Sequence, residues 1–123
     1  MERLLLVDDE ENVLIGMGRY FRAVGFSVDC ARGSEEADAL LFLKTYSAAI
    51  VDLCLSAGQG AQGLELIDRL RRRSPTTRIL VLTAFGSAET ELEARRLGAD
   101  RFLQKPRPLS EVHEELRNLL DAV

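Results

Sequence analysis

Short, mostly apolar runs alternate five times with segments of helical character along this chain, and this alternation limits the possible folds more than any other feature. Apolar runs of this length that end at a polar residue are typical of strands buried on both faces of a parallel sheet. Strands alternating with helices through short connections predict an α/β fold with helices on both faces. The predicted strands are residues 4–7, 26–31, 48–51, 79–82 and 101–104.

The segments between these strands have the periodicity of amphipathic helices. Ser34 is predicted to cap the second helix, because its hydroxyl can accept a hydrogen bond from the first turn. The third helix is expected to follow a glycine-rich loop from Ser56 to Gly63, and the weakly apolar fourth helix has Leu92 among its few anchors. The predicted helical segments are 13–24, 34–41, 64–70, 87–97 and 112–123.

The chain has 123 residues, the size of one domain, so residues 1–123 are interpreted as a single domain with its own core. A formal net charge of -4 gives no electrostatic reason to expect direct nucleic-acid binding. No apolar run approaches the length of a membrane span, and no signal peptide is predicted. Cys30 and Cys54 form neither a disulfide framework nor a metal-binding pattern, so we expect a cytoplasmic protein.

Polar side chains of chemical interest follow four of the five predicted strands. The carboxyl ends of parallel strands share one edge of the sheet, so residues distant in sequence become neighbours there. Carboxylates gathered at such an edge repel one another unless a cation neutralises them, and oxygen ligands favour a hard ion such as Mg²⁺. The residues are Asp8, Asp9 and Glu10 after the first strand, Asp52 after the third, Thr83 after the fourth and Lys105 after the fifth.

This set of residues suits phosphoryl transfer to a carboxylate. Asp52 can act as the nucleophile, and transfer then requires positioning and neutralisation of the phosphoryl oxygens. Mg²⁺ and the Lys105 ammonium would supply positive charge, and the Thr83 hydroxyl would donate a hydrogen bond. Ala84 is small enough to leave the approach to Asp52 open. The Lys105-Pro106 bond is a candidate cis peptide that would fix the direction of the lysine.

Each residue taken singly has an ordinary structural interpretation. An acidic run after a strand can begin a helix, because carboxylates suit the positive end of the helix dipole. Asp52 could be a turn residue, Thr83 a strand terminus and Lys105 a solvated surface charge. Their joint placement at four strand ends is poorly explained in this way, and it favours a functional site.

The sequence resembles the receiver domain of two-component response regulators over nearly its whole length. The resemblance implies a flavodoxin-like (βα)₅ fold, doubly wound, with strand order 2-1-3-4-5. The segments that carry it are LVDDE at 6–10, IVDL at 50–53, VLTA at 81–84, and the stretch from GAD at 98–100 to KP at 105–106.

The resemblance also implies roles for individual residues. Asp52 would be the phosphoacceptor, and Asp9 and Asp52 would bind Mg²⁺ directly, with Mn²⁺ as an alternative metal. The backbone carbonyl of Cys54 would complete the protein ligands, and Asp8 would act through water. Thr83 and Phe102 would form a switch pair that responds to the phosphoryl group.

The partners implied by the resemblance are a sensor histidine kinase or a phosphotransfer protein. The face formed by the fourth helix, fifth strand and fifth helix would bind an output domain or a second copy of the chain. The lone histidine, His113, falls in the last helix far from the strand ends and is expected to be a surface residue rather than a phosphodonor.

Several positions depart from the usual family pattern. Ser56 stands where a proline commonly follows the phosphoacceptor, and the loop across 56–63 is about three residues longer than usual. This loop borders the predicted site and bears on metal geometry and phosphoryl lifetime. Arg107 and Arg95 replace residues that are usually apolar.

Three other functions compete with the receiver. A hydrolase of the haloacid dehalogenase type also uses an aspartate after a strand, but it normally carries a second aspartate where this chain has Cys54. A flavin-binding carrier would need a phosphate-binding loop after the first strand, where acidic residues stand instead. A pseudo-receiver that binds partners without phosphorylation is disfavoured by the complete set of acids, Thr83 and Lys105, and permitted by the altered loop.

Overall fold

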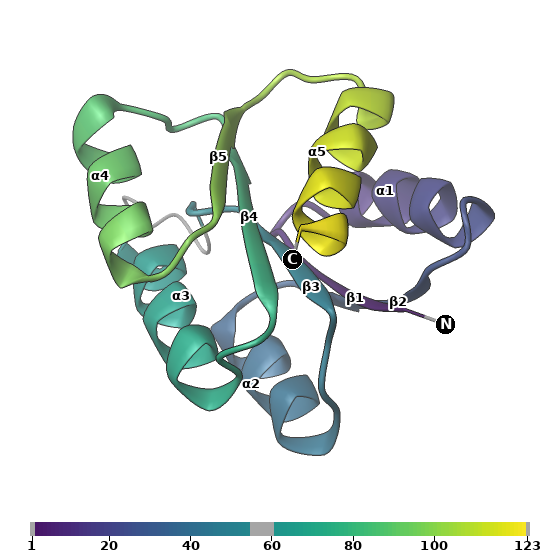
Figure 1. The fold of residues 1–123 in the computed structure, drawn as a ribbon, viewed down its shortest axis with the longest axis horizontal. Helices are drawn as coiled ribbons and strands as arrows, with labels where there is room; N and C mark the ends of the chain where they lie inside the picture. Colours follow the sequence, from purple (N-terminus) through teal and green to yellow (C-terminus); the bar gives the residue numbers. More distant parts are fainter. Residues whose placement is uncertain (1, 55–60, 123) are drawn as a thin grey trace.

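A parallel sheet lies at the centre of the computed structural model, which describes residues 2–54 and 61–122 (Figure 1). Its strands are β1 (Arg3–Val7), β2 (Ser27–Ala31), β3 (Ala48–Val51), β4 (Arg78–Thr83) and β5 (Arg101–Gln104). They pair in the order β2-β1-β3-β4-β5, and each pair is parallel. The predicted strands and the predicted strand order are therefore confirmed, with differences of one residue at some ends.

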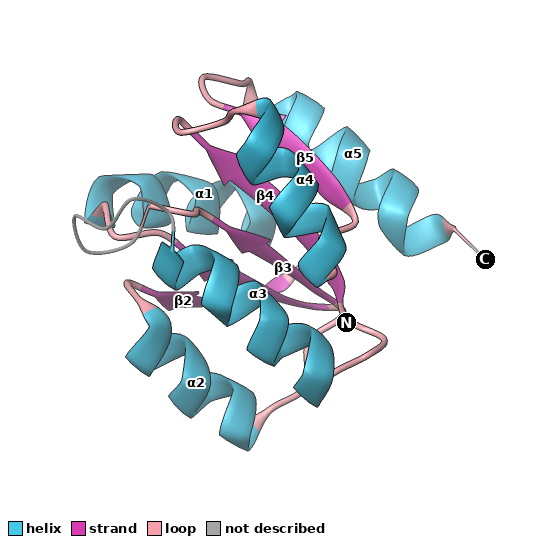
Figure 2. Ribbon diagram, turned by 90° about the vertical axis from the view of Figure 1, so that its left-hand side faces the viewer, coloured by secondary structure: helices cyan, strands magenta, loops and turns pink. Residues whose placement is uncertain are grey.

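Helices cover both faces of this sheet (Figure 2). They are α1 (Glu11–Ala23), α2 (Ser34–Leu43), α3 (Ala61–Arg73), α4 (Ala88–Leu97) and α5 (Leu109–Asp121). Helices α1 and α5 pack on one face, and α2, α3 and α4 pack on the other. Among the described residues, no helix has the length and apolar character needed to cross a membrane.

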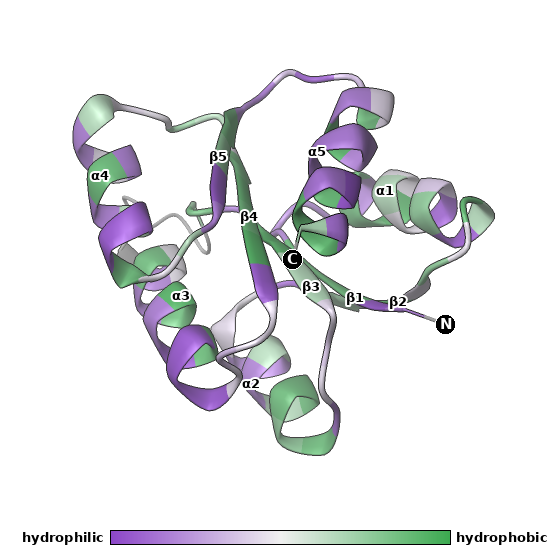
Figure 3. Ribbon diagram, viewed as in Figure 1, coloured by the Kyte–Doolittle hydropathy of each residue, from purple (hydrophilic) through white to green (hydrophobic). Residues whose placement is uncertain are grey.

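Successive strand residues serve the two faces alternately, as the pleat of a strand requires. Leu4 and Leu6 join the core under α1 and α5, whereas Leu5 and Val7 join the core under α2, α3 and α4. Because both faces are buried, β3 and the interior positions of β1 and β4 are apolar, whereas β1 and β4 each begin with an arginine (Figure 3). Polar residues at this sheet are therefore concentrated at the strand ends, where the candidate site lies.

Helices α1, α4 and α5 begin within three residues of their predicted starts, whereas the capping of α2 and the start of α3 differ in ways that affect the interpretation. The residue that precedes α2 is Gly33, and Ser34 is the first helical residue and makes no capping hydrogen bond, so the predicted cap was wrong. Helix α3 begins at Ala61, which places Gly63 inside its first turn rather than in a loop. Residues 55–60 lie outside the described part of the chain, and with them most of the lengthened loop, Ser56 included.

Two side-chain placements also differ. Leu92 is 71% exposed and does not anchor α4, whereas Ala94 is fully buried and Leu97 packs against the core. Two residues of helix turn a side chain through about 200°, so Leu92 and Ala94 cannot face the sheet together. His113 is half-buried rather than on the open surface, because its ring packs edge-on against Tyr20, Phe21 and Phe26.

Candidate functional site

The strand register places Asp8 and Asp52 side by side at the carboxyl edge of the sheet. Val7 pairs with Val51, and the backbone amide of Asp52 donates a hydrogen bond to the carbonyl oxygen of Val7 at 2.9 Å. Both aspartates are the first residues after buried strands, and only 4% of Asp8 and 6% of Asp52 is exposed. Two carboxylates are thus held next to each other with little access to water.

Lys105 lies between these carboxylates. Its ammonium nitrogen is 2.7 Å from Oδ2 of Asp8 and 3.1 Å from Oδ2 of Asp52. The backbone amide of Lys105 donates to the carbonyl oxygen of Thr83 at 2.9 Å, which continues the pairing of β5 with β4 to the site. The Lys105-Pro106 peptide bond is cis, as predicted.

The second oxygen of each carboxylate accepts a backbone hydrogen bond. The amide of Glu10 donates to Oδ1 of Asp8 at 2.9 Å, and the amide of Cys54 donates to Oδ1 of Asp52 at 3.1 Å. In both cases the donor stands two residues after the aspartate, so the two turns are built alike. These bonds fix how each carboxylate is directed.

Burial and charge compete in setting the pKa values at this site. Burial raises the pKa of Asp8, and this effect outweighs the hydrogen bonds from Lys105 and from the Glu10 amide. Burial alone would lower the pKa of Lys105, but the hydrogen bond to Asp8 and the charges of Asp52 and Asp8 outweigh it and raise that pKa. Lys105 therefore carries a positive charge. Because this single charge faces the carboxylates of both Asp8 and Asp52, a further cation would reduce the repulsion between them.

The donor chemistry fits a hard divalent ion. One carboxylate oxygen from each of Asp8, Asp9 and Glu10 lies within 4.8 Å of the others. Asp52 is joined to this group through Lys105, which contacts both Asp52 and Asp8. The side-chain donors of this group are carboxylate oxygens alone, which is the ligand type that Mg²⁺ prefers.

Glu10 was not among the predicted metal ligands, although it was predicted to stand after the first strand. In the structure it is the residue that precedes α1, so its carboxylate is carried close to those of Asp8 and Asp9. The run of three acids was the signal available in the sequence. The structure of the turn from β1 into α1 was needed to show that the carboxylate of Glu10 lies close to those of Asp8 and Asp9.

Thr83 and Phe102 lie on the same face of the sheet. Val81 pairs with Phe102, and Thr83 follows Val81 by two residues, so the three side chains point to one side. Thr83 is fully buried and its hydroxyl oxygen accepts a hydrogen bond from the amide of Phe85 at 3.2 Å. Phe102 is half-buried and packs against the core under α2, α3 and α4. Ala84 is exposed beside Thr83.

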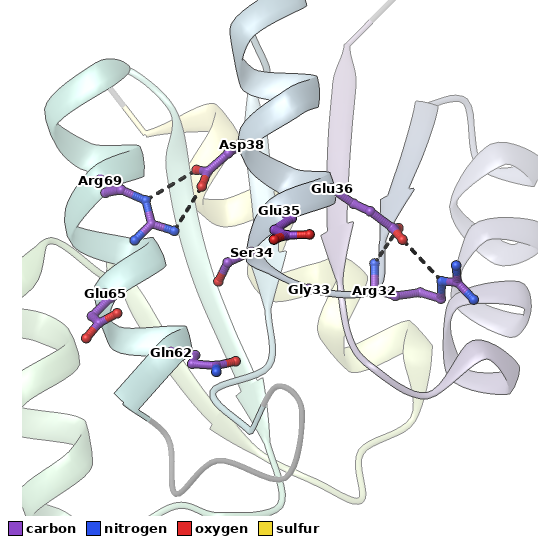
Figure 4. Close-up of a pocket in the computed structure, with 9 residues that line it drawn as sticks. All are labelled: Arg32, Gly33, Ser34, Glu35, Glu36, Asp38, Gln62, Glu65 and Arg69. Atoms are coloured by element: carbon purple, nitrogen blue, oxygen red, sulfur yellow. Dashed lines mark hydrogen bonds and ion pairs between the residues drawn. The ribbon is translucent and has the colours of Figure 1, made fainter.

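A separate polar groove opens where α2 and α3 begin (Figure 4). It has a volume of about 650 Å³, and ion pairs Arg32–Glu36 and Arg69–Asp38 cross two of its sides. None of the predicted site residues lines it. The predicted residues Asp8, Asp52 and Lys105 therefore form a cluster of their own, apart from this groove.

Comparison with known proteins gives a consistent result. Residues 4–117 match the family described as the response regulator receiver domain. The chain is 36% identical over 118 residues to the transcriptional regulatory protein TctD of Salmonella typhimurium, covering 96% of this chain and 51% of that protein. The chain spans about half to three fifths of the length of the curated relatives it matches.

Solved structures show the same fold. A response regulator from Burkholderia pseudomallei, with a phosphorylated aspartic acid, a calcium ion and citrate, is 32% identical with a TM-score of 0.89, covering 97% of this chain and 69% of that one. The response regulator TrrA from Thermotoga maritima, in complex with Mg²⁺-BeF, is 28% identical with a TM-score of 0.83, covering 97% of this chain and 99% of that one.

Proposed function

Because this chain belongs to the family of response regulator receiver domains, we propose that it is a phosphorylation switch in which Asp52 accepts a phosphoryl group beside Mg²⁺. The family is a signalling module of two-component systems and not a conventional enzyme. Chemistry by this chain would be limited to transfer of the phosphoryl group to itself and its later hydrolysis. The proposal takes residues 1–123 as one such domain.

One observation carries this proposal: Lys105 bridges two buried carboxylates that follow adjacent strands. A partly buried lysine that only stabilised the fold would need one carboxylate partner, and the second leaves an excess of negative charge. This excess suits a divalent cation. The sulfur-free, oxygen-only acidic group described above meets that requirement.

In the proposed reaction, an oxygen of the Asp52 carboxylate attacks phosphorus. The bond from phosphorus to the nitrogen of a phosphohistidine, or to the leaving oxygen of a small phosphodonor, breaks as the new bond forms. Lys105 offers its ammonium to one phosphoryl oxygen, and the Thr83 hydroxyl donates to another. Ala84 presents no bulk at the approach.

Asp9, Asp52 and the backbone carbonyl of Cys54 would hold the Mg²⁺, with Asp8 acting through water. When bound, the ion neutralises charge on the phosphoryl oxygens as they approach the carboxylates. The relatives from Burkholderia pseudomallei and Thermotoga maritima support this part of the proposal, since one holds a phosphorylated aspartic acid with calcium and the other holds Mg²⁺-BeF.

Thr83 and Phe102 would change conformation in response to the phosphoryl group. Attraction of the Thr83 hydroxyl toward it would free space on the face shared with Phe102, which lets that ring turn inward. The result is a shift between two existing conformations of the surface formed by α4, β5 and α5. A histidine kinase or phosphotransfer protein would supply the phosphoryl group, and an output domain or a second copy of the chain would bind that surface.

The test is phosphorylation by acetyl phosphate in the presence of Mg²⁺, followed by intact-protein mass spectrometry. The natural sequence should gain one phosphoryl group, and both Asp52→Asn and removal of Mg²⁺ by a chelator should abolish the gain. A natural sequence that gains no phosphoryl group and does not respond to Mg²⁺ with beryllofluoride would instead be a pseudo-receiver that binds partners without phosphorylation.

A further inference from the structure

Gly63, in the first turn of α3, lies directly against the backbone of Leu53. A Cβ atom added to Gly63 would lie 2.4 Å from Cα, 2.6 Å from the carbonyl oxygen and 2.8 Å from the carbonyl carbon of Leu53. Both residues are buried. All three contacted atoms belong to the main chain, so no side-chain rotation could relieve the overlap. Only glycine allows α3 to approach this closely.

Leu53 joins the two residues that the proposed function assigns to the metal, Asp52 and Cys54. On one side, this turn is held by the hydrogen bond from the Asp52 amide to the carbonyl oxygen of Val7. Within the turn, the Cys54 amide donates to Oδ1 of Asp52. On the other side, it meets Gly63. The turn is thus enclosed between β1 and α3.

We propose that Gly63 is a positioning residue of the metal site. By lacking a side chain, it allows α3 to hold the Leu53 peptide so that the Asp52 carboxylate and the Cys54 carbonyl keep the separation a shared cation needs. This inference rests on the proposed function, because it takes Asp52 and Cys54 as metal ligands. The start of α3 would then affect metal binding although it contributes no metal ligand.

The test is the Gly63→Ala variant. Ordinary contact begins at 3.4 Å, so the new methyl group requires α3 and the turn to separate by about 1 Å from the 2.4 Å approach. We expect the dissociation constant for Mg²⁺ to rise about 10- to 100-fold, the usual loss when a residue that orients ligands is changed. The chain has no tryptophan, so Mg²⁺ binding is measured by isothermal titration calorimetry rather than by intrinsic fluorescence.

Two control variants separate positioning from general stability. Gly16 lies in α1, where an added Cβ meets nothing within 4 Å, so Gly16→Ala should keep Mg²⁺ affinity and raise the melting temperature. Leu64 neighbours Gly63 and packs against the core, so Leu64→Ala should lower the melting temperature. It should keep Mg²⁺ affinity within about threefold, because the Leu53 backbone is left undisturbed.

A folded Gly63→Ala variant that binds Mg²⁺ as tightly as the natural sequence would overturn this inference, whatever its melting temperature. If that variant is too unstable to titrate, the same measurement in the Gly16→Ala background decides by the same criterion. If the natural sequence itself binds no Mg²⁺, then the proposed function fails. If the natural sequence and the Gly63→Ala variant bind Mg²⁺ with the same affinity, only the inference about Gly63 fails and the proposed function stands.

Discussion

The ammonium nitrogen of Lys105 lies 3.1 Å from Oδ2 of Asp52, although the two residues are 53 positions apart in the chain. The same nitrogen contacts Asp8, so one cation links the ends of β1, β3 and β5. A buried carboxylate without a partner would be costly, and Lys105 lowers that cost for two of them at once. In the proposed function, this arrangement would leave the lysine in place to neutralise charge when a metal and a phosphoryl group bind.

Lys105→Met should separate metal binding from phosphorylation. Removing one positive charge beside Asp8 and Asp52 should tighten Mg²⁺ binding severalfold, because the ammonium and the ion compete for the same carboxylates. The rate of phosphorylation by acetyl phosphate should fall about 100-fold, since a donor to the transferring oxygens is lost. Calorimetry gives the affinity, and the time course of intact mass gives the rate.

Lys44 offers the matched control, because it is the other lysine of the chain and pairs with Asp29 away from the site. Lys44→Met removes the same charge and should leave both quantities unchanged. If Lys105→Met is phosphorylated as fast as the natural sequence, Lys105 has no part in the chemistry.

Thr83→Val should uncouple phosphorylation from the conformational response. Valine keeps the shape of the buried side chain and replaces its hydroxyl with a methyl group. We expect Asp52 still to be phosphorylated, while the phosphorylation-dependent change at the Phe102 ring disappears from aromatic NMR spectra. Thr83→Ser keeps the hydroxyl and should keep the change. A response at Phe102 that survives in Thr83→Val would exclude this hydroxyl as the link.

Arg71→Met should destabilise the fold without touching the site. The Arg71 guanidinium donates to the carbonyl oxygens of Pro75, Thr77 and Gly98 and contacts Asp100 at 2.9 Å, which ties the end of α3 to the start of β5. Loss of these partly buried bonds should lower the free energy of unfolding by about 2–4 kcal/mol. Urea denaturation measures the change.

The neighbouring residue Arg72 provides the control for that substitution. Its side chain is 78% exposed and, within the described part of the chain, pairs along α3 with Asp68, so Arg72→Met should change the free energy of unfolding by no more than about 0.5 kcal/mol. Equal effects of the Arg71 and Arg72 substitutions would show that the Arg71 bonds do not stabilise the fold.

Tyr46→Phe should give a pH-dependent loss of stability. The Tyr46 hydroxyl donates to Oδ2 of Asp29 at 2.7 Å, and the free energy of unfolding near pH 7 should fall by about 1–2 kcal/mol without it. Burial would raise the pKa of Asp29, but the hydrogen bonds from Tyr46 and Lys44 outweigh it and lower that pKa. Burial and the bond to Asp29 raise the pKa of Tyr46.

The direction of the pH effect follows from these pKa changes. Because the pKa of Asp29 is lowered by folding, its contribution is present above about pH 4 and is lost as the pH falls through the folded value. Because the pKa of Tyr46 is raised, its contribution is present below about pH 10 and is lost as the pH rises through the folded value. The difference between natural and Tyr46→Phe proteins should therefore shrink at both extremes in denaturation experiments.

Tyr20→Phe is the control, since phenylalanine keeps the ring contacts of Tyr20 with Phe21 and His113. It should show no such pH-dependent difference. A Tyr46→Phe difference that stays constant from pH 3 to pH 7 would contradict the role of Asp29.

The sheet and the core of the site could be predicted because both depend on local pattern. Asp8, Asp52 and Thr83 each stand at the end of an apolar run, Lys105 follows the fifth predicted strand, and parallel strands bring such positions to one edge. The predicted neighbours Asp8, Asp52 and Lys105 are in direct contact. The positions of the predicted strands in the sequence were therefore enough to predict that these side chains lie together.

Other features depend on distances between elements, which local pattern does not contain. Gly63 appears in the sequence as a loop residue, and its close approach to Leu53 exists only once α3 packs beside β3. Leu92 is apolar enough to pack in the core, but it is exposed, and the buried side of α4 is the one that carries Ala94. His113 was expected at the surface, and its aromatic surroundings come from the packing of α5 on α1.

The most direct test of the central claim is to locate the phosphoryl group chemically. After treatment with acetyl phosphate and Mg²⁺, borohydride reduces an aspartyl phosphate to homoserine and releases phosphate, and peptide mass spectrometry then identifies the converted residue. Homoserine at position 52 alone, absent without Mg²⁺ and absent in Asp52→Asn, is the predicted result. Homoserine at Asp8 or Asp9, or at no position in a protein that remains folded, would contradict the assignment of Asp52 as the phosphoacceptor.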